Sequence, residues 1–149
     1  MNYYFIDGNN LAGKLKGISN IKAGQNQLMR EKLISVLSRY YSKDRNQIIV
    51  FFDGFTREAI RAGRIKIIYS NRKTADDEIK EAIANHKNPR LITLITSDNN
   101  LREFGKACSC RIKSCEELSL DIEASVEHDD EKERIQKISN SEIKKLFGI

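Results

Sequence analysis

Three largely apolar runs of the chain end directly at an aspartate. The runs cover residues 1–6, 48–52 and 91–97, and the acids that follow them are Asp7, Asp53 and Asp98. Short continuous apolar runs are typical of strands in a parallel sheet whose two faces are covered by helices. Because ligands of such sheets bind outside the carboxyl ends of the strands, we expect the three carboxylates to meet at one edge.

Most of the remaining segments have apolar residues spaced as in helices, and two others have patterns typical of further strands. Helices are expected over five segments: 25–41, 74–86, 98–107, a segment that begins near 114, and 140–147. Two further strands are expected at 64–70 and 110–113, and residues 54–63 are expected to form a loop or a short helix. Strands that alternate with helices predict an α/β fold, a three-layer α/β/α sandwich with a mostly parallel central sheet.

Two residues carry local expectations that the fold can test. Gly8 follows Asp7 directly, and we expect it to adopt a backbone conformation that is closed to other residues. Arg30 lies on the polar side of the segment 25–41, so it is expected to face outward while Leu33 and Leu37 face inward.

Length and composition favour one domain over residues 1–125, followed by a charged C-terminal helical extension over 126–149. The chain has no apolar run near the roughly 18 residues of a membrane span and no basic-then-apolar leader. We therefore expect no membrane partner and a cytoplasmic location. The three cysteines are an odd number within eight positions, which favours free thiols over a disulfide framework.

The net charge of +5 is distributed unevenly. Residues 11–73 contain fourteen Lys or Arg against four acids, whereas residues 116–142 contain ten acids against three bases. A basic body favours a polyanionic partner, here a nucleic acid. The candidate contacts to its phosphate backbone are Lys14, Lys16, Arg57, Arg61, Arg72 and Lys73. Phe55, close to Asp53, is expected either to stack on a base or to pack in the core.

A fourth acidic segment follows Thr74, which has the position of a helix N-cap and places Asp76 and Asp77 in the first turn. Two carboxylates about 4 Å apart repel by roughly 4 kcal/mol at an effective dielectric constant near 20. Converging acids therefore favour a bound cation, and oxygen ligands favour Mg²⁺ or Mn²⁺ over Zn²⁺. Such a cation activates water and polarises phosphate, so the residues indicate a metal-dependent enzyme that acts on phosphodiesters.

Four motifs in register carry a resemblance to a known family. They are Asp7-Gly8-Asn9-Asn10-Leu11, Phe52-Asp53-Gly54, Thr74-Ala75-Asp76-Asp77-Glu78-Ile79 and Thr96-Ser97-Asp98-Asn99. Over about residues 2–125 the chain resembles the NYN domains of the PIN-like nuclease superfamily, and within it the YacP-like ribonuclease branch. The resemblance implies a PIN-like fold that binds Mg²⁺ or Mn²⁺ and cuts RNA internally. It also implies an action on messenger RNA at the ribosome.

Carried over by position, the resemblance assigns metal binding and catalysis to Asp7, Asp76 and Asp98, with Asp53 as a further acid at the rim of the site. Asn10 would orient a ligand or Asp7 itself. Asn9 departs from the family pattern and is expected not to touch the acids.

The hydrolytic mechanism has Asp53 or Asp77 orienting a water molecule, with no covalent intermediate. Two other classes stay open. The first is a catalytically inactive RNA-binding or ribosome-docking module of the same fold, although a binder of polyanions gains nothing from acids in its cleft. The second is a phosphoryl-receiver or phosphatase-like protein, although paired acids after the first strand and a Lys after the last are not found in this sequence.

Overall fold

A computed structural model of the protein describes the backbone of residues 1–146 and the side chains of residues 1–132 and 135. The chain divides into two compact units, Met1–Ser119 and Leu120–Ile149. The predicted boundary between residues 125 and 126 lies within the same long helix as this division. Among the residues described, no helix has the length and apolar character needed to cross a membrane.

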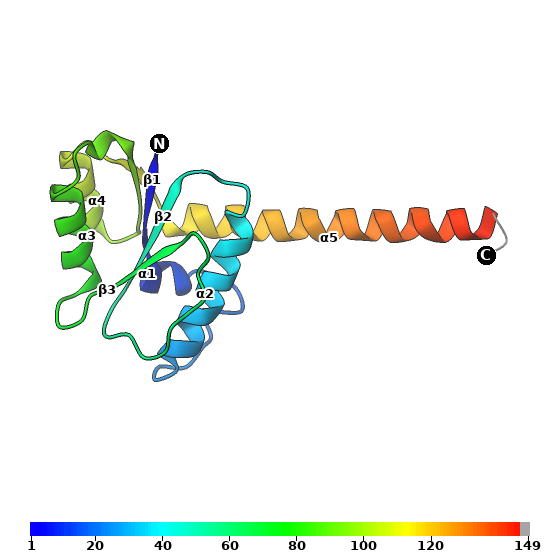
Figure 1. Ribbon diagram of the computed structural model, residues 1–149, viewed down its shortest axis with the longest axis horizontal. Coiled ribbons are helices and arrows are strands. Elements are labelled where there is room, and N and C mark those ends of the chain that lie inside the picture. Colours follow the sequence, from blue (N-terminus) through cyan, green and yellow to red (C-terminus); the bar gives the residue numbers. More distant parts are fainter. Residues whose placement is uncertain (147–149) are drawn as a thin grey trace. The chain divides into compact units, whose positions relative to one another are not determined.

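The first unit is built on a five-stranded sheet (Figure 1). Its strands are β1 Tyr3–Asp7, β2 Gln47–Phe52, β3 Lys66–Tyr69, β4 Ile92–Ile95 and β5 Arg111–Lys113. They lie in the order β3-β2-β1-β4-β5, and all four neighbouring pairs are parallel. The strand order reverses at β1, whose neighbours are β2 and β4. In sheets of this kind the crevice at the reversal point is the usual ligand site.

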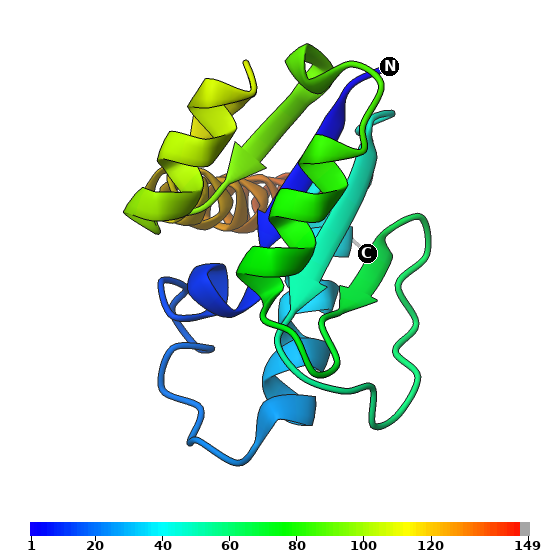
Figure 2. The ribbon, with the colours of Figure 1, turned by 90° about the vertical axis from the view of Figure 1, so that its left-hand side faces the viewer.

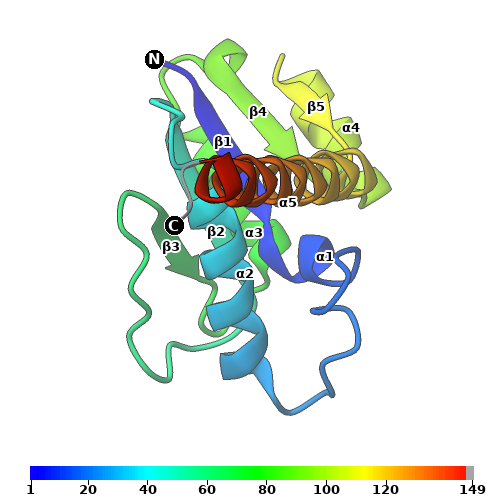
Figure 3. The same ribbon diagram turned by 90° about the vertical axis from the view of Figure 1, so that its right-hand side faces the viewer.

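Helices cover both faces of the sheet, which gives the predicted three-layer α/β/α arrangement (Figures 2 and 3). The helices are α1 Gly8–Ala12, α2 Asn26–Tyr40, α3 Ala75–Ala84, α4 Asn99–Ala107 and α5 Cys115–Leu146, with a 3₁₀ turn at Pro89–Leu91. Helices α3 and α4 lie on one face, and α2 lies on the other.

The two faces of the sheet are separated by the alternation of side chains along each strand. On β1, Phe5 packs into the cluster under α3 and α4, where it meets Phe51, Ile79 and Leu94. Tyr4 points to the opposite face and contacts the ring of Tyr41 at the end of α2, with 5.3 Å between ring centroids. A strand that is buried on both faces must be apolar at consecutive positions, as β1 and β2 are.

The predicted elements are confirmed with two differences. Residues 54–63 form a loop, which is one of the two expectations stated for them. A short helix, α1, begins immediately after Asp7, where no helix was expected. One continuous helix, α5, replaces the separate helix predicted at 140–147. Phe147, the predicted end of that helix, lies outside the described residues.

Arg30 is a correction to the sequence analysis. It was expected to face solvent, but only 2% of the residue is exposed. Its guanidinium donates hydrogen bonds to the carbonyl oxygens of Asp53 and Phe55 and lies over the rings of Phe52 and Tyr69. A buried Arg needs such partners, because an unpaired buried charge is strongly destabilising. Helical periodicity alone cannot reveal carbonyls supplied by another segment.

Gly8 is required for a different reason from the one expected. It has an ordinary helical backbone and does not have a positive φ angle, so the expectation of a special conformation is wrong. A Cβ atom at this position would lie 2.7 Å from the carbonyl oxygen of Phe51 and 2.7 Å from the ring of Phe52. Glycine therefore allows the start of α1 to approach the end of β2.

We expect Gly8→Ala to destabilise the protein by about 1–3 kcal/mol, the usual cost of overpacking a core that cannot relax. Gly13→Ala is the matched control, because its Cβ would meet no atom closer than 3.5 Å and its backbone is helical. Urea denaturation of the two variants measures the difference. Equal free energies of unfolding would show that the close approach at Gly8 is not a constraint.

Candidate active site

Asp7 is the last residue of β1 and lies at the reversal point of the sheet. Only 5% of the residue is exposed, and one carboxylate oxygen accepts a 2.9 Å hydrogen bond from the hydroxyl of Thr96. The pKa of Asp7 is raised to about 6, mainly by burial and also by the charges of Asp76 and Asp53, against the hydrogen bond from Thr96, which lowers it. A carboxylate of this kind is kept in an environment that disfavours its own charge.

Asp76 connects the other acids of the site. It lies in the first turn of α3 and is partly buried. Burial raises its pKa, and so do the negative charges of Asp98 and Asp53, while Lys80 lowers it. Asp76 in turn raises the pKa of Asp7. The four acids predicted from the ends of three strands and the start of α3 therefore interact at one edge of the sheet.

Asp98 and Asp53 each use one oxygen to hold the start of a helix. Oδ1 of Asp98 accepts the N–H of Leu101 at 2.9 Å, which caps α4. Oδ1 of Asp53 accepts the N–H of Ala75 at 2.7 Å, at the start of α3. The second carboxylate oxygen of each acid accepts no hydrogen bond from the part of the chain that the structure describes. Both residues combine a structural role with a charge at the site.

Two asparagines of α1 tie the ends of the strands together. The side-chain oxygen of Asn9 accepts the N–H of Asp53 at 3.1 Å, and that of Asn10 accepts the N–H of Ser97 at 3.2 Å. The main-chain N–H of Asn10 also donates to Asp7. The expectation that Asn9 does not touch the acids is corrected, because it holds the backbone of Asp53. Asn9 departs from the residue type that the family commonly has at this position, so the resemblance did not predict this contact.

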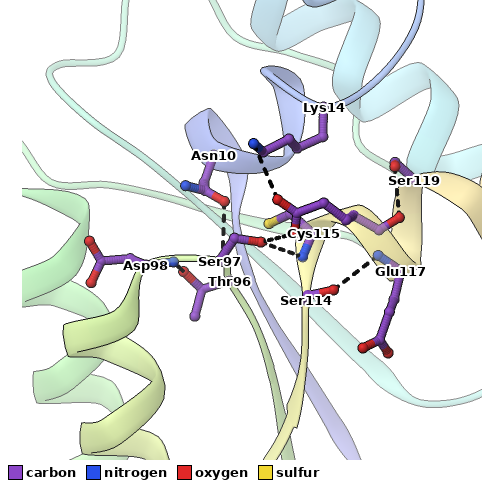
Figure 4. Close-up of polar contacts among 10 residues, drawn as sticks. Asn10, Lys14, Thr96, Ser97, Asp98, Ser114, Cys115, Glu117 and Ser119 are labelled. Atoms are coloured by element: carbon purple, nitrogen blue, oxygen red, sulfur yellow. Dashed lines mark hydrogen bonds and ion pairs between the residues drawn. The ribbon is translucent and has the colours of Figure 1, made fainter.

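Glu116 is a residue of the site region that the sequence analysis did not single out. It follows Cys115, whose contact with Ser97 is drawn in Figure 4. Its carboxylate accepts a hydrogen bond from the hydroxyl of Ser97 and forms an ion pair with Lys14, with 3.2 Å between Nζ and Oε1. The pKa of Glu116 is lowered to about 2, first by the hydrogen bond from Ser97 and also by the contact with Lys14. Ser97 Oγ also accepts the N–H of Cys115 at 2.9 Å. This network holds the segment that leads into Asp98.

The cysteines are free thiols, as expected. Cys115 is fully buried beside the site, and burial, followed by the charge of Asp7, raises its pKa to about 12. Burial likewise raises the pKa of Cys110 to about 11. Because the thiolate is the reactive form, neither of these buried thiols is suited to be a nucleophile.

The six Lys and Arg residues predicted to contact RNA fall into two groups, those that form an ion pair within the protein and those that do not. Lys14 pairs with Glu116, and Lys73 pairs with Glu81 at 3.0 Å. The other members are exposed and form no ion pair with any residue described: Lys16, Arg57, Arg61 and Arg72.

The donor atoms of the site fit a hard divalent cation. They are carboxylate oxygens, and their mutual repulsion would be relieved by a positive charge. Within the described residues, however, no three His, Cys, Asp or Glu side chains are arranged closely enough to hold a metal ion together. Mg²⁺ is commonly held by one or two carboxylates, with water and substrate phosphate as its other ligands. Asp7, Asp76 and Asp98 are the candidate ligands, of which one or two at a time would hold the ion.

Comparison with known proteins agrees with this architecture. Two crystal structures of Rae1 (YacP) from Bacillus subtilis match the chain at 27% identity. A mutant form gives a TM-score of 0.74 over 94% of this chain and 85% of that chain, and a second structure gives 0.72 over 95% and 84%. No curated protein matches the sequence significantly. The family model described as the YacP-like NYN domain matches residues 4–147, and the chain therefore belongs to that family.

Proposed function

We propose that the protein is a divalent-metal-dependent endoribonuclease, a phosphodiester hydrolase that cleaves RNA at its aspartate cluster. Membership of the YacP-like NYN family supports a nuclease-like function that acts on RNA. The observation that carries the proposal is the electrostatic coupling of Asp7, Asp76 and Asp98 at the reversal point of the sheet. Acids that raise one another's pKa in a cleft are typical of functional sites.

The side chains divide the work as follows. One or two of Asp7, Asp76 and Asp98 would hold the cation, and Mg²⁺ or Mn²⁺ bound there would supply the positive charge that polarises a phosphate and activates water. Thr96 orients the carboxylate of Asp7 through its hydroxyl. Asp53 fixes the start of α3 and hence the position of Asp76. Asp77, exposed in the same turn, orients the attacking water.

The RNA backbone is bound by the exposed Lys and Arg side chains of the first unit. Arg57, Arg61 and Arg72 are exposed and unpaired within the described chain, so they can contact phosphates without breaking an ion pair. Lys14 and Lys73 must exchange an acidic partner for a phosphate. In this proposal the substrate is messenger RNA on the ribosome, and the enzyme acts in the cytoplasm.

A non-catalytic RNA-binding or ribosome-docking module is the second candidate. The observation in its favour is that, among the described residues, no three acidic, His or Cys side chains are close enough to hold a metal ion. The coupled acids argue against it, because negative charge at this edge of the sheet repels a polyanion unless a cation neutralises it.

We expect Asp76→Asn and Asp98→Asn to lower the rate of RNA cleavage in Mg²⁺ or Mn²⁺ by about a hundredfold or more, the usual effect of removing a positioned catalytic group. Asn is a good N-cap residue, so Asp98→Asn should keep α4 folded. Glu103→Gln is the matched control, since it neutralises an exposed acid on α4. Wild-type rates in both folded aspartate variants would refute the assignment.

We also expect Mg²⁺ or Mn²⁺ to stabilise the folded protein without any substrate. A ligand at a concentration about 100 times its Kd adds roughly 2.7 kcal/mol to the free energy of unfolding, which corresponds to a rise of several degrees in Tm. Thermal melting with and without the ion measures this rise. It should be much smaller in Asp7→Asn and unchanged in Glu103→Gln. An equal rise in Asp7→Asn would place the ion elsewhere.

In the absence of metal, we expect Asp7→Asn to be more stable than the wild type at pH 8. The folded protein holds the Asp7 proton up to a pKa of about 6, whereas the unfolded chain releases it near 3.8. The wild type therefore loses stability as the pH rises from about 4 to 6, by up to about 3 kcal/mol for a shift near two units.

The amide in Asp7→Asn does not ionise, so its advantage should be present at pH 8 and vanish near pH 4. Urea denaturation in EDTA at the two pH values measures it, with Glu103→Gln as the control that shows no such change. A variant that is less stable than the wild type at pH 8 would contradict the expectation.

A further inference from the structure

Phe55 is an aromatic residue whose side chain is held in solvent. It is 58% exposed, and it is the only Phe or Tyr among the described residues in the exposed class. The two phenylalanines that end β2, Phe51 and Phe52, are buried. Of the two sequence-based expectations for Phe55, packing in the core is therefore wrong.

The ring is exposed because the backbone of its loop is anchored by polar contacts. The buried guanidinium of Arg30 donates to the carbonyl oxygen of Phe55 at 2.9 Å and to that of Asp53. Gly54 turns the chain with a φ angle of 90°, and its N–H donates to the hydroxyl of Ser70 at 2.9 Å. The residue is thus fixed in place without burying its side chain.

Arg30 is itself held rigidly beneath the loop. Its guanidinium carbon lies 4.9 Å from the ring centroid of Tyr69 and 5.6 Å from that of Phe52. Cation–π contacts of this kind are stronger when the cation is removed from water, as it is here. A buried cation that binds two carbonyls of one turn limits the positions that Phe55 can adopt.

The loop begins at the edge that carries the acids (Figure 2). Phe55 follows Asp53 by two residues, and the carboxylate of Asp53 binds the N–H of Ala75, next to Asp76. The carbonyl of Gly54 accepts the N–H of Asn71 at 2.9 Å, which ties the loop to the segment before α3. The Cα atom of Phe55 is therefore two residues along the chain from the Cα atom of Asp53, at about 3.8 Å per residue.

The charge around Phe55 is complementary to a nucleic-acid backbone. Arg57 follows Phe55 by two residues, and Arg72 follows Asn71, whose N–H binds the carbonyl of Gly54. Arg61 lies further along the loop, next to Ala62, which borders Tyr41 and Ile48 at the other end of the sheet. These three arginines are exposed and have no ion-pair partner in the described part of the chain. Aromatic rings interleaved with such cations are the usual combination in sites for single-stranded nucleic acid.

We propose that Phe55 is a stacking platform for one unpaired base of single-stranded RNA, bound beside the acid cluster with its phosphates on Arg57 and Arg72. The inference rests on the proposed function and adds a substrate class to it. In a duplex the faces of the bases are covered by their neighbours, so an exposed ring reads unpaired nucleotides. The protein then selects single-stranded segments.

The first test uses the absence of tryptophan from the sequence. Phe55→Trp gives the chain of 149 residues a single indole at the proposed platform, and stacking on a base quenches the fluorescence of that indole. We expect saturable quenching by a single-stranded oligoribonucleotide in EDTA, where metal-dependent cleavage does not occur. A blunt RNA duplex of the same length should quench weakly. Binding without quenching, or equal quenching by the duplex, would overturn the inference.

The second test separates stacking from general apolar contact. Phe55→Leu keeps an apolar side chain without an aromatic face, and we expect it to weaken single-strand binding about tenfold. Phe55→Tyr should bind as the wild type does. Leu28→Ala is the control for removal of another exposed apolar side chain, and it should leave binding unchanged. Wild-type affinity in Phe55→Leu would overturn the inference. A wild-type protein that binds no single-stranded RNA would overturn it as well.

These measurements are independent of catalysis. Fluorescence quenching and the difference in RNA affinity between Phe55→Leu and Phe55→Tyr are measured in EDTA. The proposed function is tested by RNA cleavage in Mg²⁺ or Mn²⁺. A protein that stacks RNA but never cuts it would refute the nuclease and support the platform. A nuclease whose Phe55→Leu variant binds and cuts single strands like the wild type would refute the platform alone.

Discussion

The mutual repulsion of carboxylates at one edge of the sheet is the constraint on which the rest of the site depends. Asp7 is buried at the centre of the edge, and Asp76 is coupled both to it and to Asp98. Like charges at close range separate or take up protons unless their positions are fixed and a cation is near. The surrounding structure must therefore hold the acids together against their electrostatic preference.

Hydrogen bonds at the ends of strands and helices supply this restraint. Asn9 and Asn10 in the first turn after β1 bind the backbone N–H groups at the ends of the two neighbouring strands. Asp53 and Asp98 bind N–H groups at the starts of α3 and α4. Because the partial positive charge of a helix N-terminus favours an anion, these contacts fix the acids and offset part of their repulsion.

The loop that follows Asp53 is anchored by the buried side chain of Arg30 and carries the exposed ring of Phe55. Arg30 places a permanent positive charge beneath the loop that follows Asp53, where it stabilises the carbonyl groups of a sharp turn. Anchoring through the backbone leaves the ring of Phe55 outside the core. Local arrangements that do not maximise stability are expected where a surface is used for binding or catalysis.

The sequence by itself determined the succession of strands and helices along the chain and the convergence of the acids at one edge of the sheet. Both follow from local rules, since an apolar run makes a buried strand and parallel strands bring their carboxyl ends to one edge. The tertiary structure alone decided the partners of Arg30, the steric need for Gly8, and the contact of Glu116 with Ser97. Each joins segments far apart in the chain, and periodicity along one segment carries no information about which distant carbonyl, ring or hydroxyl will meet it.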